Sequence, residues 1–194
     1  LHRALLPAGL LGTAASLSAC GGGGGSDDDA PAVVPGGPAA ASISEAQAAR
    51  FLSQAAMGIT RDGMARVRQL GYSGWLDEQM ASPAGVSRWD WMVARGFNKI
   101  DNRNNQTGFD PAVWSKLIAA PDTLRQRITL ALSEVIVVSI EGLPVAWRQF
   151  AAAQWLDLLE SNAFGNLRAL LGEVSRNLAM GYYLTFRGNA KSNT

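Results

Sequence analysis

Cysteine and histidine are nearly absent from this sequence of 194 residues. Cys20 is the one cysteine and His2 is the one histidine, so an internal disulfide is excluded. Both residues belong to an N-terminal segment that we expect to be an export leader ending just before Cys20. Beyond that point the sequence holds no imidazole and no further thiol. Within this stretch, a Cys–His dyad, a Ser–His–Asp triad and zinc ligation by histidine are therefore excluded.

Charge is also scarce. Charged residues make up 17% of the chain and apolar residues 47%, a balance that is typical of a globular core. Of the 17 Lys and Arg residues, Arg3 lies in the expected leader, which leaves 16 cations against 16 Asp and Glu residues. Because no basic excess is left to neutralise phosphates, we expect no nucleic-acid partner.

The N-terminal apolar run at 4–15 is too short for a comfortable membrane span and is typical of an export signal. It leads into Leu-Ser-Ala-Cys at 17–20, which resembles the bacterial lipobox. We therefore predict a lipoprotein signal peptide at 1–19 and an acylated Cys20 that binds membrane lipid. A plain secretory signal with an incidental cysteine is the alternative.

The residue after the cysteine and the segment that follows refine this prediction. Gly21 rather than Asp follows Cys20, and this resembles outer-membrane sorting in lipoproteins. The segment 20–43 is rich in Gly, Ala, Pro and Asp and cannot bury enough apolar surface to offset its ordering entropy. It is predicted to be a flexible linker, which as a random coil spans on the order of 25 Å.

A folded domain is predicted from residue 44 onward. Ser44 with Gln47 forms a capping-box signature, and Thr60 can cap a second helix that Gly71 ends. Ser73 can cap a third helix. No segment shows convincing period-two alternation, so the predicted fold class is all-α, a multi-helix orthogonal or bundle-like domain over 44–194.

Longer helices are expected further along, at 122–138, 145–159 and around 167–174. The intervening segment 84–109, rich in Asn and Gly, is interpreted as a surface loop or insertion. Four tryptophans are expected to pack in the core because they lie on apolar helix faces: Trp75, Trp114, Trp147 and Trp155.

Several motifs of this domain resemble the bacterial domain of unknown function 1800 family. They occur in order at 49–55 (ARFLSQA), 70–79 (LGYSGWLDEQ), 124–127 (LRQR), 131–133 (ALS), 163–168 (AFGNLR), 179–184 (AMGYYL) and 188–191 (GNAK). The resemblance implies an exported helical protein, and the family is named for its lack of an assigned activity. Members continue into an Asn-Tyr-Ala-Arg-Glu-like motif, so this sequence is expected to be an N-terminal fragment, truncated at its C-terminus.

Three charges on the long helix predicted at 122–138 are candidate ligand-binding groups: Arg125, Arg127 and Glu134. Arg127 and Glu134 are seven residues apart, so they share a face at about 10 Å of rise and could form two ends of a polar groove. The alternative is a solvated flank whose charges pair with neighbouring helices.

A second candidate cluster comprises Arg187, Asn189 and Lys191 around Gly188. Arg offers a bidentate fork to phosphate or carboxylate, although a glycine-terminated helix end with cations that complement its dipole explains the same pattern. Trp89 and Trp91, beside the polar loop, are candidates for exposed stacking on carbohydrate.

These patterns favour an envelope lipoprotein whose helical domain binds a polysaccharide or a partner protein. A hydrolase-like enzyme, completed by a missing C-terminal part, is the alternative, and an assembly factor cannot be separated from the first class. The glycine tract at 21–25 lacks the Lys-Ser/Thr ending of a phosphate loop, and the segment 101–105 departs from a calcium loop. We therefore expect no cofactor and no metal.

Overall fold

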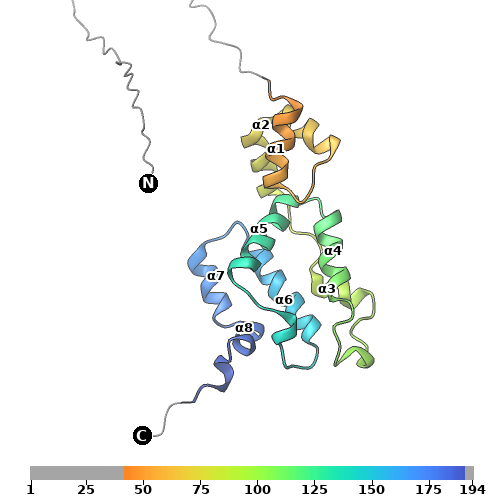
Figure 1. The fold of residues 1–194 in the computed structure, drawn as a ribbon, viewed down its shortest axis with the longest axis vertical. Coiled ribbons are helices and arrows are strands. Elements are labelled where there is room, and N and C mark those ends of the chain that lie inside the picture. Colours follow the sequence, from red (N-terminus) through yellow and green to blue (C-terminus); the bar gives the residue numbers. More distant parts are fainter. Residues whose placement is uncertain (1–41, 191–194) are drawn as a thin grey trace, which may run out of the picture. The chain divides into compact units, whose positions relative to one another are not determined.

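The computed structural model describes residues 42–190, which contain α-helices and short 3-10 helices without a strand (Figure 1). The predicted all-α class is confirmed. The predicted leader at 1–19, Cys20 and nearly all of the linker lie outside the described residues. The helices are α1 (Glu45–Ala55), α2 (Arg61–Ala81), α3 (Arg88–Ala94), α4 (Phe109–Ala119), α5 (Thr123–Val135), α6 (Arg148–Ser161), α7 (Leu167–Val174) and α8 (Leu178–Tyr183). None of these helices is both long and apolar enough to cross a membrane.

The first two helices begin at the predicted caps. Ser44 and Gln47 form the reciprocal capping box of α1, and the Thr60 side chain accepts a hydrogen bond from the Gly63 backbone at the start of α2. Gly71 has non-helical backbone angles, with φ +74° and ψ 172°. α2 therefore consists of two helical stretches that meet at a kink, and Gly71 separates them as predicted. The cap by Ser73 stays a prediction.

The segment predicted as a surface loop contains a helix, and that prediction is corrected. Ser87 caps α3, whose buried side chains are Arg88 and Met92. Two features made this helix difficult to recognise in the sequence. It has only seven residues, too few for a periodic pattern, and one of its two buried positions carries a charge.

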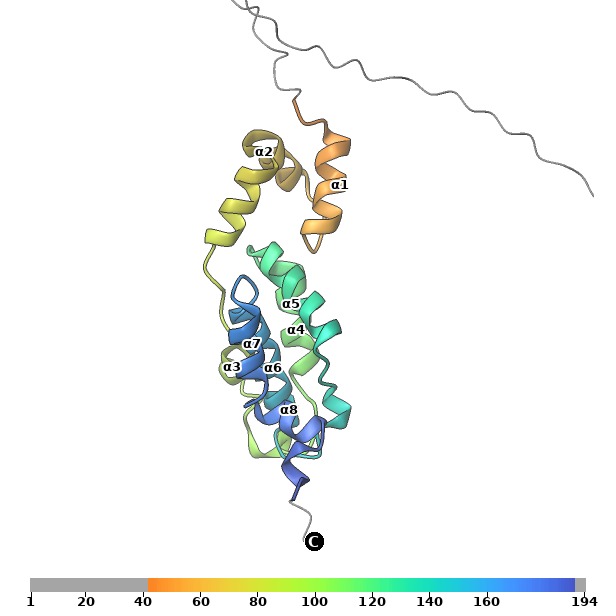
Figure 2. The same ribbon diagram turned by 90° about the vertical axis from the view of Figure 1, so that its left-hand side faces the viewer.

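Helix α6 lies at the centre of the domain and packs against α3, α4, α5 and α8 (Figure 2). Its buried side chains belong to two apolar clusters. Trp155 and Leu159 pack with residues of α7 and α8, whereas Phe150 and Ala153 pack with Met92 of α3 and a residue of α4. A third apolar cluster joins α1, α2 and α5. Because α6 is apolar on several faces, it holds the other helices around it.

The four tryptophans expected in the core divide into two groups. Trp75 and Trp155 are buried, and Trp147 is half-buried. Trp114 is 60% exposed, so its predicted core position is wrong. The reason lies in the face that α4 buries, which contains Ala112 and Lys116 rather than the tryptophan. Because a charged residue lies on the buried face of α4, the sequence pattern indicated the wrong face as the buried one.

Candidate functional site

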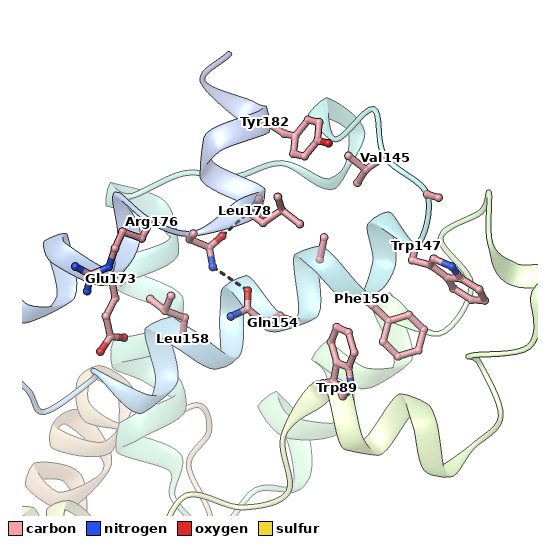
Figure 3. Close-up of a pocket in the computed structure, with 14 residues that line it drawn as sticks. Trp89, Val145, Trp147, Phe150, Gln154, Leu158, Glu173, Arg176, Leu178 and Tyr182 are labelled. Atoms are coloured by element: carbon pink, nitrogen blue, oxygen red, sulfur yellow. Dashed lines mark hydrogen bonds between the residues drawn. The ribbon is translucent and has the colours of Figure 1, made fainter. Parts of the chain in front are cut away.

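A groove of about 740 Å³ runs along α6 between α3 and α8 (Figure 3). Its volume lies within the range of small-molecule sites, roughly 300–1,000 Å³. We call it the aromatic groove. It is lined by Trp89, Val145, Ala146, Trp147, Phe150, Ala151, Gln154, Leu158, Glu173, Arg176, Asn177, Leu178, Ala179 and Tyr182. Most of these groups are apolar, and the polar ones gather toward the end near α7.

Three aromatic rings form one end of the aromatic groove. The ring centroids of Trp89 and Phe150 lie 4.9 Å apart at 69°, and those of Trp147 and Phe150 lie 5.9 Å apart at 72°. Both pairs are edge-to-face arrangements, which aromatic quadrupoles favour. Phe150 is buried, while Trp89 is 43% exposed. The two indoles therefore flank a buried phenyl ring and keep surface available to a ligand.

The backbone of Trp147 is held in a conformation that bulky residues rarely adopt. Its φ is +61°, in the left-handed region, which costs about 1–2 kcal/mol for a residue with a Cβ. Its N–H donates to the Arg103 carbonyl at 2.7 Å, and its own carbonyl accepts from Phe150 at the start of α6. These bonds hold the strained residue in place. Strain of this kind gathers at ligand sites, which makes Trp147 a functional candidate.

The other end of the aromatic groove carries amide and charged groups. Asn177 Nδ2 donates to Gln154 Oε1 at 2.8 Å, so these two amides partly satisfy one another. Asn162 Nδ2 donates to Glu173 Oε2 at 2.8 Å. Arg176 is exposed, and no hydrogen bond or ion pair joins its guanidinium to the part of the chain that the structure describes.

A buried charge network joins α3, α4, α5 and α6. The Arg88 side chain is 1% exposed and contacts Asp157 at 3.1 Å and Glu160 at 2.5 Å. Glu160 also contacts Lys116 Nζ of α4. Two cations therefore share one carboxylate that is 4% exposed. A buried charge is tolerated only when it is paired and hydrogen-bonded, so each member depends on the others.

The buried charge network continues into α5. Arg88 Nη2 donates to Gln126 Oε1 at 3.0 Å, and Gln126 Nε2 contacts the carboxylate of Asp122 at 3.3 Å. Asp122 lies 3.4 Å from Arg125 Nε. The buried charge network thus comprises Arg88, Lys116, Asp122, Arg125, Gln126, Asp157 and Glu160, with three cations balancing three carboxylates.

Asp157 connects this network to the aromatic groove. Its two carboxylate oxygens accept hydrogen bonds from the backbone N–H groups of Arg88 at 2.9 Å and Trp89 at 3.0 Å. These N–H groups belong to the first turn of α3, where they have no partner within the helix. A carboxylate at a helix N-terminus is also favoured by the helix dipole. Asp157 of α6 therefore fixes the start of α3 and, with it, the position of Trp89.

The candidate residues predicted on the long helix lie in different environments. Arg125 belongs to the buried charge network and also donates to the Ser82 carbonyl at 3.0 Å. Arg127 is half-buried and lies 3.5 Å from the Ser53 carbonyl. Glu134 is exposed. None of the three lines the aromatic groove, so their proposed role in a polar groove stays a prediction.

The candidates of the second cluster and the two candidate stacking tryptophans also lie in different environments. Asn189 is exposed, whereas the Arg187 side chain and Lys191 lie outside the part that the structure describes. Trp89 lines the aromatic groove. Trp91 does not line it. The Trp91 ring stacks on Phe97 with centroids 6.2 Å apart, and Arg95 Cζ lies 3.7 Å from the centroid of the Trp91 ring.

Sequence reasoning missed most of the buried charge network and the polar end of the groove. One signal was available in α6, where Asp157 and Glu160 sit three residues apart among Trp155, Leu156, Leu158 and Leu159. Carboxylates on a helix that is apolar nearly all round must find cations. No comparable signal marked Lys116 as buried. Across residues 42–190, no three His, Cys, Asp or Glu side chains gather as metal ligands would.

Comparison with known proteins gives a family without an assigned activity. The family model described as "Protein of unknown function (DUF1800)" matches residues 50–194. No curated protein and no solved structure matches the chain. The matched range covers more than half of the sequence and contains every helix from α2 to α8. The chain therefore belongs to the DUF1800 family of proteins of unknown function.

Proposed function

We propose that this protein is a lipid-anchored binding protein of the bacterial cell envelope whose aromatic groove takes a polysaccharide segment. The observation that carries the proposal is the pair of indoles, Trp89 and Trp147, that flank Phe150 at one end of the groove. The faces of sugar rings present C–H groups that stack on indoles, while their hydroxyls hydrogen-bond to amides and charged groups. The groove offers both kinds of surface.

Binding is favoured over hydrolysis by the state of the nearby carboxylates. Glu173 is the one carboxylate among the groove-lining residues, whereas Asp157 and Glu160 do not line the groove and are both paired with Arg88. Glycoside hydrolysis needs two carboxyl groups that flank the scissile bond. Because these carboxylates are used in holding the helices together, the groove is better suited to hold a glycan than to cleave one.

Replacing Trp89 with Ala is expected to weaken polysaccharide binding at least about tenfold, a loss of about 1.4 kcal/mol. The stacking surface is removed, while the backbone hydrogen bond from residue 89 to Asp157 stays. Affinity electrophoresis through gels that contain neutral or acidic soluble polysaccharides measures the change. Trp114→Ala is the matched control, since Trp114 is 60% exposed and lies outside the groove. Equal retardation of wild type and Trp89→Ala, or no retardation of the wild type by any polymer, would contradict the proposal.

The anchor is proposed on the sequence Leu-Ser-Ala-Cys at 17–20. Acyl chains on Cys20 would add about 0.8 kcal/mol of membrane affinity for each buried methylene. Cys20→Ser removes the thiol that carries them, so the variant is expected in the non-membrane fraction of cells that express the full gene. Fractionation followed by immunoblotting checks this. A variant that still sediments with membranes and needs detergent for release would refute the anchor.

A further inference from the structure

The polar groups of the aromatic groove differ in what they can still bind. Asn177 Oδ1 accepts from the backbone N–H groups of Ala179 and Met180 and so caps α8, while its Nδ2 donates to Gln154. These two amides hold α8 against α6. Glu173 accepts from Asn162 at the end of α6. The side chains of Gln154, Asn177 and Glu173 therefore already form hydrogen bonds within the protein.

Arg176 is different, because its guanidinium has no hydrogen-bond or ion-pair partner within residues 42–190. It follows α7 in the short turn before α8, and Figure 3 shows it at the opposite end of the groove from Trp147. Glu173 lies one turn earlier, but no ion pair joins the two residues, and their charged ends extend in different directions. The groove therefore ends at an unpaired cation.

The separation of this cation from the aromatic end is set by α6. Groove-lining residues on this helix run from Trp147 at its N-cap to Leu158, which lies near Arg176 in Figure 3. Eleven residues of α-helix span about 16 Å. A ligand that reaches both ends must therefore be extended, with an apolar face at one end and an anionic group at the other.

We propose that the polysaccharide held in the aromatic groove is acidic, with a sugar carboxylate bound by Arg176 and another ring stacked on the exposed surface of Trp89. This inference rests on the proposed function. A guanidinium binds a carboxylate through two parallel hydrogen bonds, which fixes the orientation of the sugar as well as its charge.

The test compares acidic polymers with their own neutral forms. Polygalacturonate and alginate are each titrated into the full chain, beside the same polymer after chemical reduction of its carboxylates to hydroxymethyl groups. Isothermal titration calorimetry measures both affinities for the wild type, Arg176→Gln and Trp89→Ala. Arg176 is exposed, so its replacement is expected to leave folding intact, which thermal melting checks.

The wild type is expected to bind at least one acidic polymer about tenfold or more tightly than its reduced form, since tenfold corresponds to about 1.4 kcal/mol and charge-assisted hydrogen bonds exceed that value. Arg176→Gln should lose this preference and retain affinity for the reduced form, whereas Trp89→Ala should weaken both. Equal wild-type affinity for the two forms overturns the acidic ligand, and a preference that survives in Arg176→Gln overturns Arg176 as the group that binds its carboxylate. Either result leaves the proposed function standing. Failure of the wild type to bind any form overturns both.

Discussion

Replacing Glu160 with Gln is expected to lower the free energy of unfolding by about 3–5 kcal/mol. The glutamine keeps the shape of the side chain but removes the negative charge that Arg88 and Lys116 share. Arg88 would then face two buried polar partners and one carboxylate, Asp157, which is 17% exposed. Lys116 is 9% exposed and has no other carboxylate within reach in the described part of the chain. An uncompensated buried cation accounts for most of the loss.

Urea unfolding followed by circular dichroism measures this effect, with the slope of the transition checked for constancy. Glu134→Gln is the control. It makes the same chemical change at an exposed position of α5, where the free energy of unfolding should change by no more than about 0.5 kcal/mol. If the two variants unfold at the same urea concentration, the buried charge network does not hold the helices together.

Trp155→Ala is expected to cost about 3–5 kcal/mol of unfolding free energy through a different mechanism, the loss of buried apolar contact and the cavity that remains. Trp155 is 1% exposed and packs with Leu159 of its own helix and with Leu170 and Val174 of α7. Its loss removes the largest side chain of that apolar cluster. We therefore expect α7 to separate from α6 before the rest of the domain unfolds.

The control for Trp155→Ala is Trp114→Ala, the same change on α4. Trp114 is 60% exposed, so its removal should change stability by no more than about 0.5 kcal/mol. Guanidinium unfolding of both variants, monitored by far-ultraviolet circular dichroism, gives the comparison. Similar losses at the two positions would contradict the assignment of these tryptophans to core and surface.

These two tryptophans also show how far sequence reasoning reached. Caps and apolar periodicity are local signals, and they gave the all-α class and the starts of α1 and α2 correctly. Periodicity failed on α4, because the helix buries Lys116 and exposes Trp114 and Ile118. Lys116 could be assigned to the interior only by knowing that Glu160 lies opposite it, 44 residues away in the chain.

The candidate site was less accessible to sequence reasoning than the fold, for the same reason. The aromatic groove combines α3, α6, α7, α8 and the turns beside them, and only Trp89 among its lining residues was singled out as a ligand-binding candidate. A ring exposed in a groove and a ring packed in a core have the same sequence pattern. The left-handed backbone of Trp147, which marks it as strained, is set by its hydrogen bond to Arg103. Contacts between residues far apart in the chain cannot be recognised from the local sequence pattern.

The most direct test of the aromatic groove is a ¹H–¹⁵N NMR titration that follows the indole N–H signals of the six tryptophans. The titrant is a fragment of a polysaccharide that the protein binds. We predict that the signals of Trp89 and Trp147 shift, while those of the buried Trp75 and Trp155 and of the exposed Trp114 do not change. A saturating titration that shifts Trp114 and leaves Trp89 and Trp147 unmoved would contradict the account.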